Sequence, residues 1–449
     1  MARLFGTDGV RGLANVDLTA PLALELGEAA ARLTIQGRPA SGHKPKAIIG
    51  GDTRISGEFL DHALAAGLAS AGMDVVRVGV VTTPTVAHLT ASSSVDLGVM
   101  ISASHNPMPD NGIKFFAHGG YKLPDQVEDQ IQELLNTSWD RPIGAAVGEV
   151  EYDDDWAEKS YIEHLMTSLG TDLHGLRIAV DCANGGASFL APEAFRQAGA
   201  DAVVINAAPD GRNINDKAGS THPEQLQALT VASEADFGVA YDGDADRCLA
   251  VDRDGNIVDG DKIMGALAVH MRDEGQLAKD TLVVTVMSNL GLILAMQEAG
   301  IKTVQTGVGD RYVLEAMLEG GYSLGGEQSG HIIAKKYATT GDGILSSLLL
   351  ARMVKESGRD LADLTSFIKR LPQTLINVGG VDRSRANTDP AVQEAVAAAE
   401  AVLGNTGRVL LRPSGTEPLV RVMVEAATQS QADGVASRLA DVVKENLAL

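Results

Sequence analysis

A strand–loop–helix pattern occurs three times along this chain of 449 residues. In each copy a short β-branched run leads into a polar loop, a helical stretch, a second such run and another helical stretch. The first runs lie at 47–50, 178–180 and 282–285, and the second runs lie at 75–78, 203–205 and 303–305. Strands that alternate with helices predict βαβαβ units with parallel sheets. The chain is therefore expected to contain three tandem α/β domains with mixed or parallel sheets.

The third strand of each copy ends in a different polar motif. The three motifs are Ser102-Ala103-Ser104-His105-Asn106-Pro107, Asp242-Gly243-Asp244-Ala245-Asp246-Arg247 and Gly326-Glu327-Gln328-Ser329-Gly330-His331. Ligand sites in parallel α/β sheets form beyond the carboxyl ends of the strands. The sequence therefore predicts one composite site that is assembled from three domains.

The expected domain boundaries follow from these repeats. We expect domains at 1–155, 156–258, 259–370 and 371–449. The acidic run 153–155 is interpreted as a solvated turn or linker, and Asp254-Gly255 as the turn of a hairpin that ends the second domain. The last segment shows no βαβαβ pattern. It predicts a small α+β domain with a strand at 374–378, helices at 390–403 and 431–446, and a strand pair around 412–418.

Composition narrows the class of protein. The net charge of -22 argues against nucleic acid and anionic membranes as partners. Only 4% of the residues are aromatic, so the cores must be mainly aliphatic. Cys182 and Cys248 lack CxxC spacing and are expected to be buried free thiols. The first residues contain no apolar leader and no apolar run approaches 18 residues, which predicts a cytoplasmic protein.

Asp242, Asp244 and Asp246 are candidate metal ligands. Three carboxylates at alternate positions concentrate hard oxygen ligands, which Mg²⁺ prefers. An EF-hand does not fit, because Arg247 and Arg253 would stand where that loop requires Gly and Glu. A surface turn is the alternative interpretation.

Ser104 is a candidate phosphorylation site. A serine hydrolase is disfavoured, because chain neighbours rarely bring an imidazole onto a hydroxyl and no Gly-x-Ser-x-Gly elbow surrounds this serine. Taken alone, Ser104 suits a helix cap or a simple turn. Its position at a strand end equivalent to that of the aspartates predicts that it faces them, which indicates phosphoryl transfer through a phosphoserine. Arg247, Lys114 and Arg11 would offset the negative charge.

Several other polar residues are candidates for roles in the same site. Lys114 is expected to act as a general acid or base, with a pKa lowered by desolvation or nearby cations, although a solvated lysine is the ordinary alternative. Glu327, Ser329 and His331 suit hydrogen bonds to sugar hydroxyls, the alternative being a helix-start turn. His331 is a second candidate for the general base.

The last domain contains a candidate phosphate cradle. Its residues, a guanidinium and two hydroxyls around a glycine, are Arg412, Ser414, Gly415 and Thr416. An ordinary hairpin turn is the alternative.

Together with Arg412-Pro413-Ser414-Gly415-Thr416-Glu417-Pro418, the three motifs resemble the signature loops of the α-D-phosphohexomutase superfamily, in the same order. The resemblance covers essentially the whole chain, with one loop per domain. The opening 5–12 and the Glu-Gln-Ser-Gly-His sugar loop are typical of a bacterial branch that acts on glucosamine phosphates. Two positions depart from the common pattern: Ala245 replaces a second glycine in the metal loop, and Met108 follows the serine loop where an aromatic residue is frequent. Alanine disfavours a positive φ at that place.

The resemblance implies four domains around a central cleft and a role for each candidate. Ser104 would be the phosphoserine, and one Mg²⁺ per subunit would bind Asp242, Asp244, Asp246 and the Ser104 phosphate. Arg11 and Arg247 would contact the transferring phosphate. His105, Glu327 and Ser329 would bind the sugar, and the cradle of the last domain would bind the other phosphate. That domain is expected to move over the cleft, and a homodimer is compatible with the family.

The implied reaction interconverts glucosamine 6-phosphate and glucosamine 1-phosphate through glucosamine 1,6-bisphosphate. It would feed the synthesis of UDP-N-acetylglucosamine and of cell-wall precursors. Two alternatives remain: a phosphomannomutase or phosphoglucomutase, and a non-catalytic sugar-phosphate sensor. Retention of Ser104, the three aspartates and Lys114 argues against the sensor.

Overall fold

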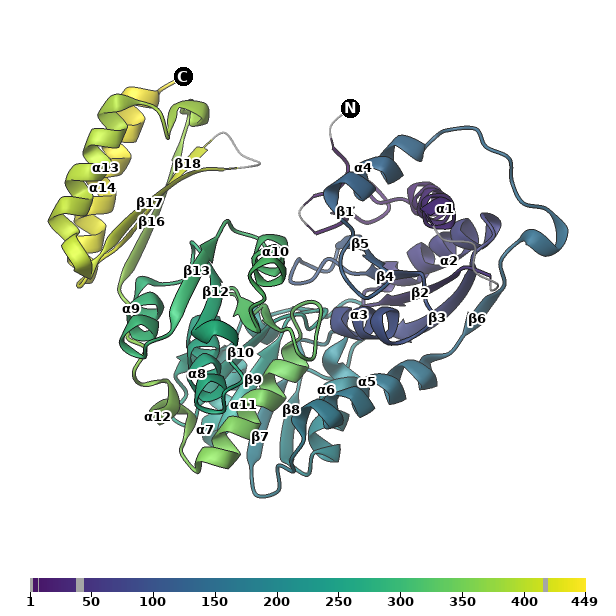
Figure 1. Cartoon of the computed structure of the whole chain (residues 1–449), viewed down its shortest axis with the longest axis horizontal. Coiled ribbons are helices and arrows are strands. Elements are labelled where there is room, and N and C mark those ends of the chain that lie inside the picture. The colour runs from purple at the N-terminus through teal and green to yellow at the C-terminus, as the bar shows by residue number, and fades with distance from the viewer. Residues whose placement is uncertain (1–2, 7, 38–43, 415–418) are drawn as a thin grey trace. The chain divides into compact units, whose positions relative to one another are not determined.

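The computed structural model describes residues 3–6, 8–37, 44–414 and 419–449. They form two compact units (Figure 1). The first unit comprises residues 1–287 and 301–366, and the second comprises residues 288–300 and 367–449. Among the described residues, no helix is both long and apolar enough to span a membrane.

The three repeats fold into three sheets with the same strand order. In the first sheet, parallel strands β2 (Lys46–Gly51), β3 (Asp74–Val80) and β4 (Leu97–Ile101) lie in the order β4-β2-β3. In the second sheet, the order is β9-β7-β8, built from β7 (Arg177–Asp181), β8 (Asp201–Ile205) and β9 (Phe237–Tyr241). In the third sheet, the order is β14-β12-β13, built from β12 (Thr281–Thr285), β13 (Lys302–Thr306) and β14 (Leu324–Gly326). The predicted mixed α/β architecture is therefore confirmed.

In each sheet the third strand turns back into an antiparallel neighbour. These neighbours are β5 (Asp110–Ala117), β10 (Cys248–Asp252) and β15 (Ile332–Ala334). The three polar motifs thus occupy one equivalent position, the turn between a parallel strand and its antiparallel partner. The first sheet also carries β1 (Val10–Leu13) beside β5 and β6 (Val150–Tyr152) beside β3. The second sheet ends in β11 (Ile257–Val258), and Gly255 has the positive φ of 84° that the predicted Asp254-Gly255 hairpin turn needs.

Helices connect these strands along the chain. In the first repeat they are α1 (Ala20–Gly37), α2 (Ile55–Ser70), α3 (Thr83–Ser92) and α4 (Asp125–Leu134). In the second they are α5 (Asp154–Leu169), α6 (Ala187–Gln197) and α7 (Glu224–Ala232). In the third they are α8 (Gly260–Asp273), α9 (Leu290–Glu298), α10 (Asp310–Gly320), α11 (Gly343–Ser357) and α12 (Leu361–Thr365).

The acidic run at 153–155 was expected to be a solvated turn or linker. Its residues are exposed, as expected, but they belong to the start of a helix instead of a linker. Asp153 caps helix α5 by accepting a hydrogen bond from the backbone N–H of Trp156, and Asp154 and Asp155 lie in the first turn. Carboxylates at a helix N-terminus accept hydrogen bonds from unpaired N–H groups and interact favourably with the helix dipole. The run therefore begins a helix.

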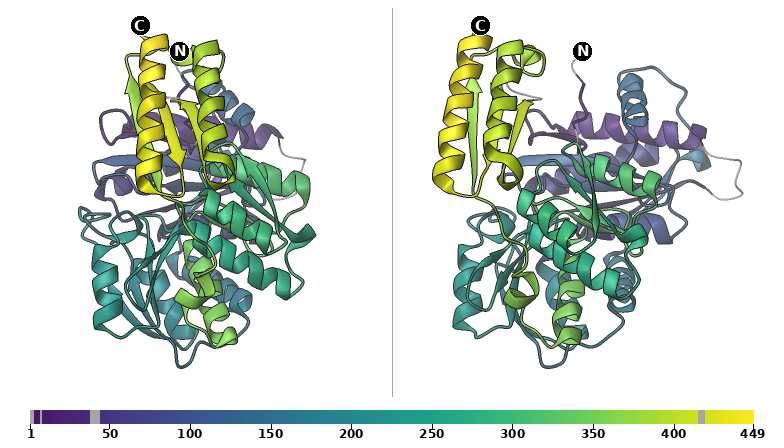
Figure 2. Two further views of the ribbon diagram at one scale, coloured as in Figure 1. Left: turned by 90° about the vertical axis from the view of Figure 1, so that its left-hand side faces the viewer. Right: turned by 60° about the vertical axis from the view of Figure 1, so that its left-hand side comes forward.

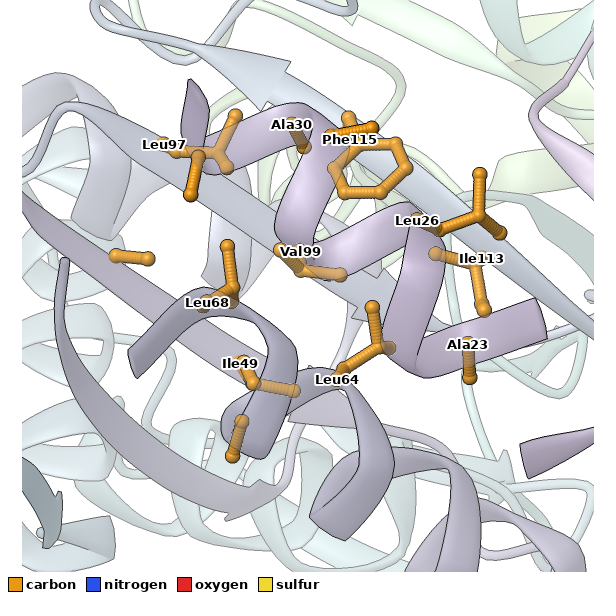
Figure 3. Packing of buried hydrophobic residues seen from close by; sticks show 14 of the residues in the cluster. Ala23, Leu26, Ala30, Ile49, Leu64, Leu68, Leu97, Val99, Ile113 and Phe115 are labelled. Atoms are coloured by element: carbon orange, nitrogen blue, oxygen red, sulfur yellow. The ribbon is translucent and has the colours of Figure 1, made fainter. Parts of the chain in front are cut away.

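The core of the first sheet is aliphatic, as the low aromatic content predicts. Ala23, Leu26 and Ala30 of α1 and Leu64 and Leu68 of α2 point towards the strands (Figure 3). There they meet a layer of fully buried strand residues, which are Ile49, Leu97, Val99, Ile113 and Phe115. Burial of a side chain of this size contributes about 1.5–3 kcal/mol. This core holds β4 and β5, and so fixes both ends of the turn that carries Ser104.

The second unit contains the predicted small α+β domain. Strands β16 (Gln373–Gly379), β18 (Leu419–Glu425) and β17 (Arg408–Pro413) form an antiparallel sheet in that order. Helices α13 (Pro390–Leu403) and α14 (Gln429–Leu447) lie side by side along it (Figure 2), and their apolar residues form one buried cluster with those of the strands. Gly415 and Thr416 of the predicted phosphate cradle lie outside the described residues.

Candidate active site

The turn after β4 brings Ser104 onto the aspartate cluster. The Ser104 hydroxyl donates a hydrogen bond to Asp242 Oδ2 at 2.5 Å, and only 1% of the residue is exposed. Ser104 has a φ of 53°, in the left-handed region that L-residues rarely adopt. The predicted meeting of the serine with the aspartates is therefore present in the structure.

Asp242, Asp244 and Asp246 form a buried group that suits a metal ion. One oxygen of each carboxylate lies within 4.8 Å of the others, and no residue in the group is more than 4% exposed. Two further oxygens, Asp244 Oδ1 and Asp246 Oδ1, are buried without a hydrogen-bond partner among the described residues. Burial and the carboxylates of Asp246 and Asp244 raise the pKa of Asp242 to about 8. Buried carboxylates without partners are costly unless a cation compensates them, so the donor set fits a divalent metal.

Ala245 adopts the backbone conformation that was expected to be difficult for alanine. Its φ is 54° and its side chain is fully buried. The backbone N–H groups of Ala245 and Gly343 donate to the carbonyls of Asp242 and Ala245, respectively, which holds the turn closed. The replacement of glycine therefore leaves the turn of the metal loop intact.

Lys114 lies on the buried face of β5 beside the cluster. Its ammonium group donates to Asp244 Oδ2 at 2.7 Å and is 2.9 Å from Asp8 Oδ2. We expected a lowered pKa, and this expectation was wrong. Burial acts to lower the pKa of Lys114, but the carboxylates of Asp244 and Asp8 outweigh it and hold the pKa above its ordinary value. Lys114 is therefore protonated in this structure.

Arg11 and Arg247 place two guanidinium groups at the same site. Arg11 pairs with Asp8, and the Arg247 Nη1 donates to His105 Nδ1 at 3.2 Å. The Nε–H of each arginine is buried and has no hydrogen-bond partner among the described residues. Such donors suit an anion, since an arginine binds phosphate oxygens through several N–H groups.

His105 is neutral at physiological pH. Burial, with the guanidinium groups of Arg247 and Arg11, lowers the pKa of His105 to about 4. Its Nδ1 lies 3.4 Å from the Ser104 hydroxyl and also accepts from Arg247. The imidazole is thus held beside the serine as an acceptor.

His331 is buried next to Asp246. Its Nδ1 lies 3.6 Å from Asp246 Oδ2, and the backbone N–H of Gly341 donates to its Nε2 at 3.0 Å. Burial lowers the pKa of His331, but Asp246 acts against it and raises the pKa overall. The Gly341 N–H nevertheless makes Nε2 an acceptor, so the proton belongs on Nδ1, facing Asp246. This geometry suits orientation of Asp246 better than removal of a substrate proton.

The predicted sugar-binding loop forms the turn between β14 and β15 instead of a helix start. Glu327 is half-buried and accepts from the backbone N–H of Gly309 at 3.1 Å, and Ser329 is exposed. The side chain of Gln328 donates to Asp261 Oδ2 at 3.1 Å. Glu327 and Ser329 thus remain accessible, whereas Gln328 is bound to α8.

The second unit presents arginines on its β17–β18 hairpin. Arg412 and Arg421 are directly opposite each other across the two strands, so their side chains share one face of the sheet. Burial and the neighbouring Arg421 lower the pKa of Arg412. Arg383 donates to the backbone carbonyl of Ser414. Like charges at opposite positions repel each other, which favours an anion at this face.

Sequence reasoning missed several residues of the site. Asp8 contacts Arg11, Lys114 and Lys122, and these cations, outweighing the effect of burial, hold the pKa of Asp8 well below its usual range. Thr83 donates to Asp244 Oδ2 at 2.6 Å. Asp8 stands in the same opening segment as Arg11, which was a signal for it. Thr83 carries no motif, and only the packing of the repeats brings it to the cluster.

Three further residues that sequence reasoning left without a role, Ser102, Asp52 and Arg54, hold the serine turn. The Ser102 hydroxyl accepts from the Ser104 N–H at 2.9 Å and donates to Asp52 Oδ2 at 2.6 Å. Arg54 pairs with Asp52 and donates to the backbone carbonyl of Ser104. Asp52 and Arg54 belong to the polar loop after β2, so the strand-end pattern pointed to them without giving a role.

Cys182 and Cys248 are buried and free, as predicted. Burial and a nearby carboxylate raise the pKa of each thiol. Such thiols are inert at physiological pH.

Four family models match the chain in order. Phosphoglucomutase/phosphomannomutase alpha/beta/alpha domains I, II and III match residues 2–141, 159–255 and 259–371, and the C-terminal domain of the same group matches 375–442. Among solved structures, a phosphoglucomutase/phosphomannomutase family protein from Burkholderia thailandensis is 26% identical, with a TM-score of 0.81 over 99% of this chain and 97% of that one. An N-acetylphosphoglucosamine mutase from Aspergillus fumigatus, solved with GlcNAc-6P and magnesium, is 20% identical with a TM-score of 0.70 over 99% and 96% of the two chains, and shares the fold.

Curated relatives are much closer in sequence. A phosphoglucosamine mutase from Bifidobacterium animalis subsp. lactis is 60% identical over the whole of both chains. A phosphoglucosamine mutase from Streptomyces coelicolor is 58% identical, also over the whole of both. At this identity over its full length, the chain belongs to the phosphoglucosamine mutases, a family of isomerases with phosphoglucomutase/phosphomannomutase domains.

Proposed function

We propose that the enzyme interconverts glucosamine 6-phosphate and glucosamine 1-phosphate through a phosphoserine at Ser104 and enzyme-bound glucosamine 1,6-bisphosphate. One observation carries the proposal. The hydroxyl of a buried serine points into a group of three buried carboxylates, and the same site holds two arginines whose Nε–H groups make no hydrogen bond to any described residue. This arrangement supplies a phosphate carrier, a metal site and donors for phosphate oxygens. The identity of the sugar as glucosamine is taken from the name of the relatives, phosphoglucosamine mutase.

The first step would transfer the phosphoryl group from Ser104 to the sugar. The bond between phosphorus and Ser104 Oγ breaks as a bond forms to the 1-oxygen of glucosamine 6-phosphate. The 1-hydroxyl loses its proton to solvent and the serine oxygen takes one from the enzyme, so the step consumes no net proton. Lys114, which is held protonated by Asp244 and Asp8, would donate the proton to the departing serine oxygen.

The second step would return the 6-phosphoryl group of the bisphosphate to Ser104. The bond between phosphorus and the 6-oxygen of the sugar breaks as a bond forms to Ser104 Oγ. The serine proton returns to Lys114, and the 6-oxygen takes a proton from solvent. In the structure, the serine hydroxyl already donates to Asp242 Oδ2, which fixes the direction of its oxygen. The intermediate must reverse its orientation between the two steps, and accessible Glu327 and Ser329 suit a sugar that binds either way round.

We propose that Asp242, Asp244 and Asp246 hold Mg²⁺ together with an oxygen of the Ser104 phosphate. When bound, this ion neutralises the carboxylates and draws charge from the transferring phosphoryl group. Arg11 and Arg247 would bind the oxygens of the transferring phosphoryl group, and His105 would bind the substrate next to that group. Arg412, with Ser414, Gly415 and Thr416, would bind the phosphate that does not react.

The test is an isomerisation assay by phosphorus NMR with purified protein, Mg²⁺ and a trace of the matching bisphosphate. Glucosamine, glucose and mannose 6-phosphates are compared in parallel. We expect kcat/KM for the glucosamine substrate to exceed the others by about 100-fold or more, the range that a site hydrogen-bonded to one substituent can reach. A preference for glucose or mannose would overturn the substrate, and no turnover with any of them would overturn the reaction.

A further inference from the structure

The reactive serine sits on a backbone that needs support. Ser104 has a φ of 53°, and a left-handed conformation at a residue other than glycine costs free energy. Such a conformation persists only where the surroundings enforce it. Because the Cα–Cβ bond follows the backbone, this conformation also sets the direction in which the Ser104 hydroxyl points.

Two side chains from different repeats bind the carbonyl groups of this turn. Arg54 donates to the carbonyl of Ser104 at 3.0 Å and to that of Asn106 at 2.8 Å. Asn215 donates from Nδ2 to the same two carbonyls, at 2.9 Å and 3.2 Å. Arg54 follows β2 in the serine's own repeat, whereas Asn215 follows β8 in the repeat that carries the aspartates. The turn is therefore held by side chains from two repeats, the one that carries Ser104 and the one that carries the aspartates.

Asn215 is suited to this contact and is poorly satisfied otherwise. Its own φ is 58°, which asparagine tolerates better than most residues, and its N–H donates to the Ala183 carbonyl at 2.9 Å. Its Oδ1 is buried and has no hydrogen-bond partner among the described residues. Reversal of the amide would set that oxygen against two carbonyl oxygens, so the amide orientation is dictated by the serine turn.

We infer that Asn215 is a positioning residue for phosphoryl transfer: its amide fixes the carbonyls of Ser104 and Asn106, and thereby aims the Ser104 oxygen at the metal site of the neighbouring repeat. The inference rests on the proposed function. It assigns Asn215 no contact with the substrate. Its effect is to couple the direction of the serine to the repeat that carries Asp242.

Two substitutions distinguish the effect of the Asn215 side-chain amide from the effect of its left-handed backbone. Asn215→Gly keeps the left-handed backbone without strain and removes the donor. Asn215→Asp keeps the shape and replaces the donor by a carboxylate that repels both carbonyls. We expect kcat to fall about 10-fold in N215G and about 100-fold in N215D, because a displacement of about 1 Å at the reacting atoms costs that much. KM for the sugar phosphate should stay within about three-fold, since substrate binding is not touched.

Asn213 offers a matched control on the same loop. Its side chain donates to the Ala208 carbonyl and accepts from the Asp210 N–H, and within the described part of the chain no hydrogen bond joins this side chain to the serine turn. Asn213→Asp makes the same chemical change and should lower the thermal unfolding midpoint while kcat stays within about two-fold. Equal loss of kcat in N213D and N215D would assign Asn215 a merely structural role and overturn the inference, as would wild-type kcat in N215G and N215D.

A crystal structure of N215D gives a readout that does not depend on turnover. We expect Ser104 to leave the left-handed region and its oxygen to move away from Asp242. Unchanged geometry at Ser104 would overturn the inference even if the sugar-phosphate assay were negative. A wild-type protein that neither turns over nor becomes phosphorylated at Ser104 by the bisphosphate would instead refute the proposed function.

Discussion

The serine turn after β4 and the sugar loop after β14 occupy equivalent positions in two repeats, yet they are held differently. In the serine turn, Ser104 is 1% exposed and its backbone is bound by Ser102, Arg54 and Asn215. In the sugar loop, Ser329 is exposed and Glu327 is only half-buried. The comparison teaches that the same fold fixes the serine that we propose to react and leaves accessible the side chains that we propose to bind the substrate in two orientations.

The largest expected effect removes the reacting group. Ser104→Ala should lower kcat by about 10⁴-fold or more, since loss of a nucleophile removes the covalent step. The matched change in the sugar loop, Ser329→Ala, should lower kcat/KM only about 10-fold, because one hydrogen bond to a sugar hydroxyl is lost. Both are measured by the phosphorus NMR assay, with the unfolding midpoint as a check of the fold. Comparable losses in the two variants would break the comparison.

Metal removal should reveal a difference between the aspartate loop and the sugar loop, in the stability of the protein as well as in its activity. Chelation should reduce turnover to about 1% or less, and Mg²⁺ at about 100 times its Kd should stabilise the stripped protein by about 2.7 kcal/mol. Asp246→Asn should weaken this stabilisation, because one carboxylate ligand is gone. Glu327→Gln is the control and should retain it in full. Calorimetry with and without Mg²⁺ measures the shift, and an unchanged response of D246N would exclude Asp246 as a ligand.

The sugar loop should affect binding more than chemistry. Glu327→Gln keeps an oxygen that can accept from Gly309 but loses the charge, so kcat/KM for glucosamine 6-phosphate should fall about 10- to 100-fold, chiefly through KM. Initial rates over a range of substrate concentrations separate the two constants. A fall in kcat at constant KM would place Glu327 with the reacting groups and remove the distinction between the loops.

The smallest effect concerns strain in the metal loop. Ala245→Gly should stabilise the protein by about 0.5–1 kcal/mol, because glycine relieves the left-handed strain at a φ of 54° but adds entropy to the unfolded chain. Turnover should not change. Ala240→Gly in β9 is the control, and should destabilise by about 0.5–1 kcal/mol because it loosens a buried strand. Urea unfolding measures both, and destabilisation of A245G would show that packing of the Ala245 methyl group outweighs the strain.

Much of the fold was predictable from local sequence. The β-branched runs, the Asp254-Gly255 turn and the helix at 390–403 all form, because alternation, turn residues and helical periodicity act over short distances along the chain. The meeting of Ser104 with the aspartates was also predictable, since equivalent strand ends of repeated units carried both. The charge state of Lys114, the candidate general acid, was not predictable. Lys114 was expected to have a lowered pKa, but Asp8 and Asp244 are brought to it by strands distant in sequence.

The sequence by itself determined the three repeats, the position of each motif at a strand end and the kind of chemistry those motifs support. Only the tertiary structure decided which side chains surround them. Asn215 and Thr83 are ordinary polar residues in the sequence, and they reach the site because the packing of the first and second repeats brings their loops together. Hydrogen bonds and ion pairs depend on separations of a few ångströms, and such separations between distant segments are set by how the cores pack rather than by local pattern.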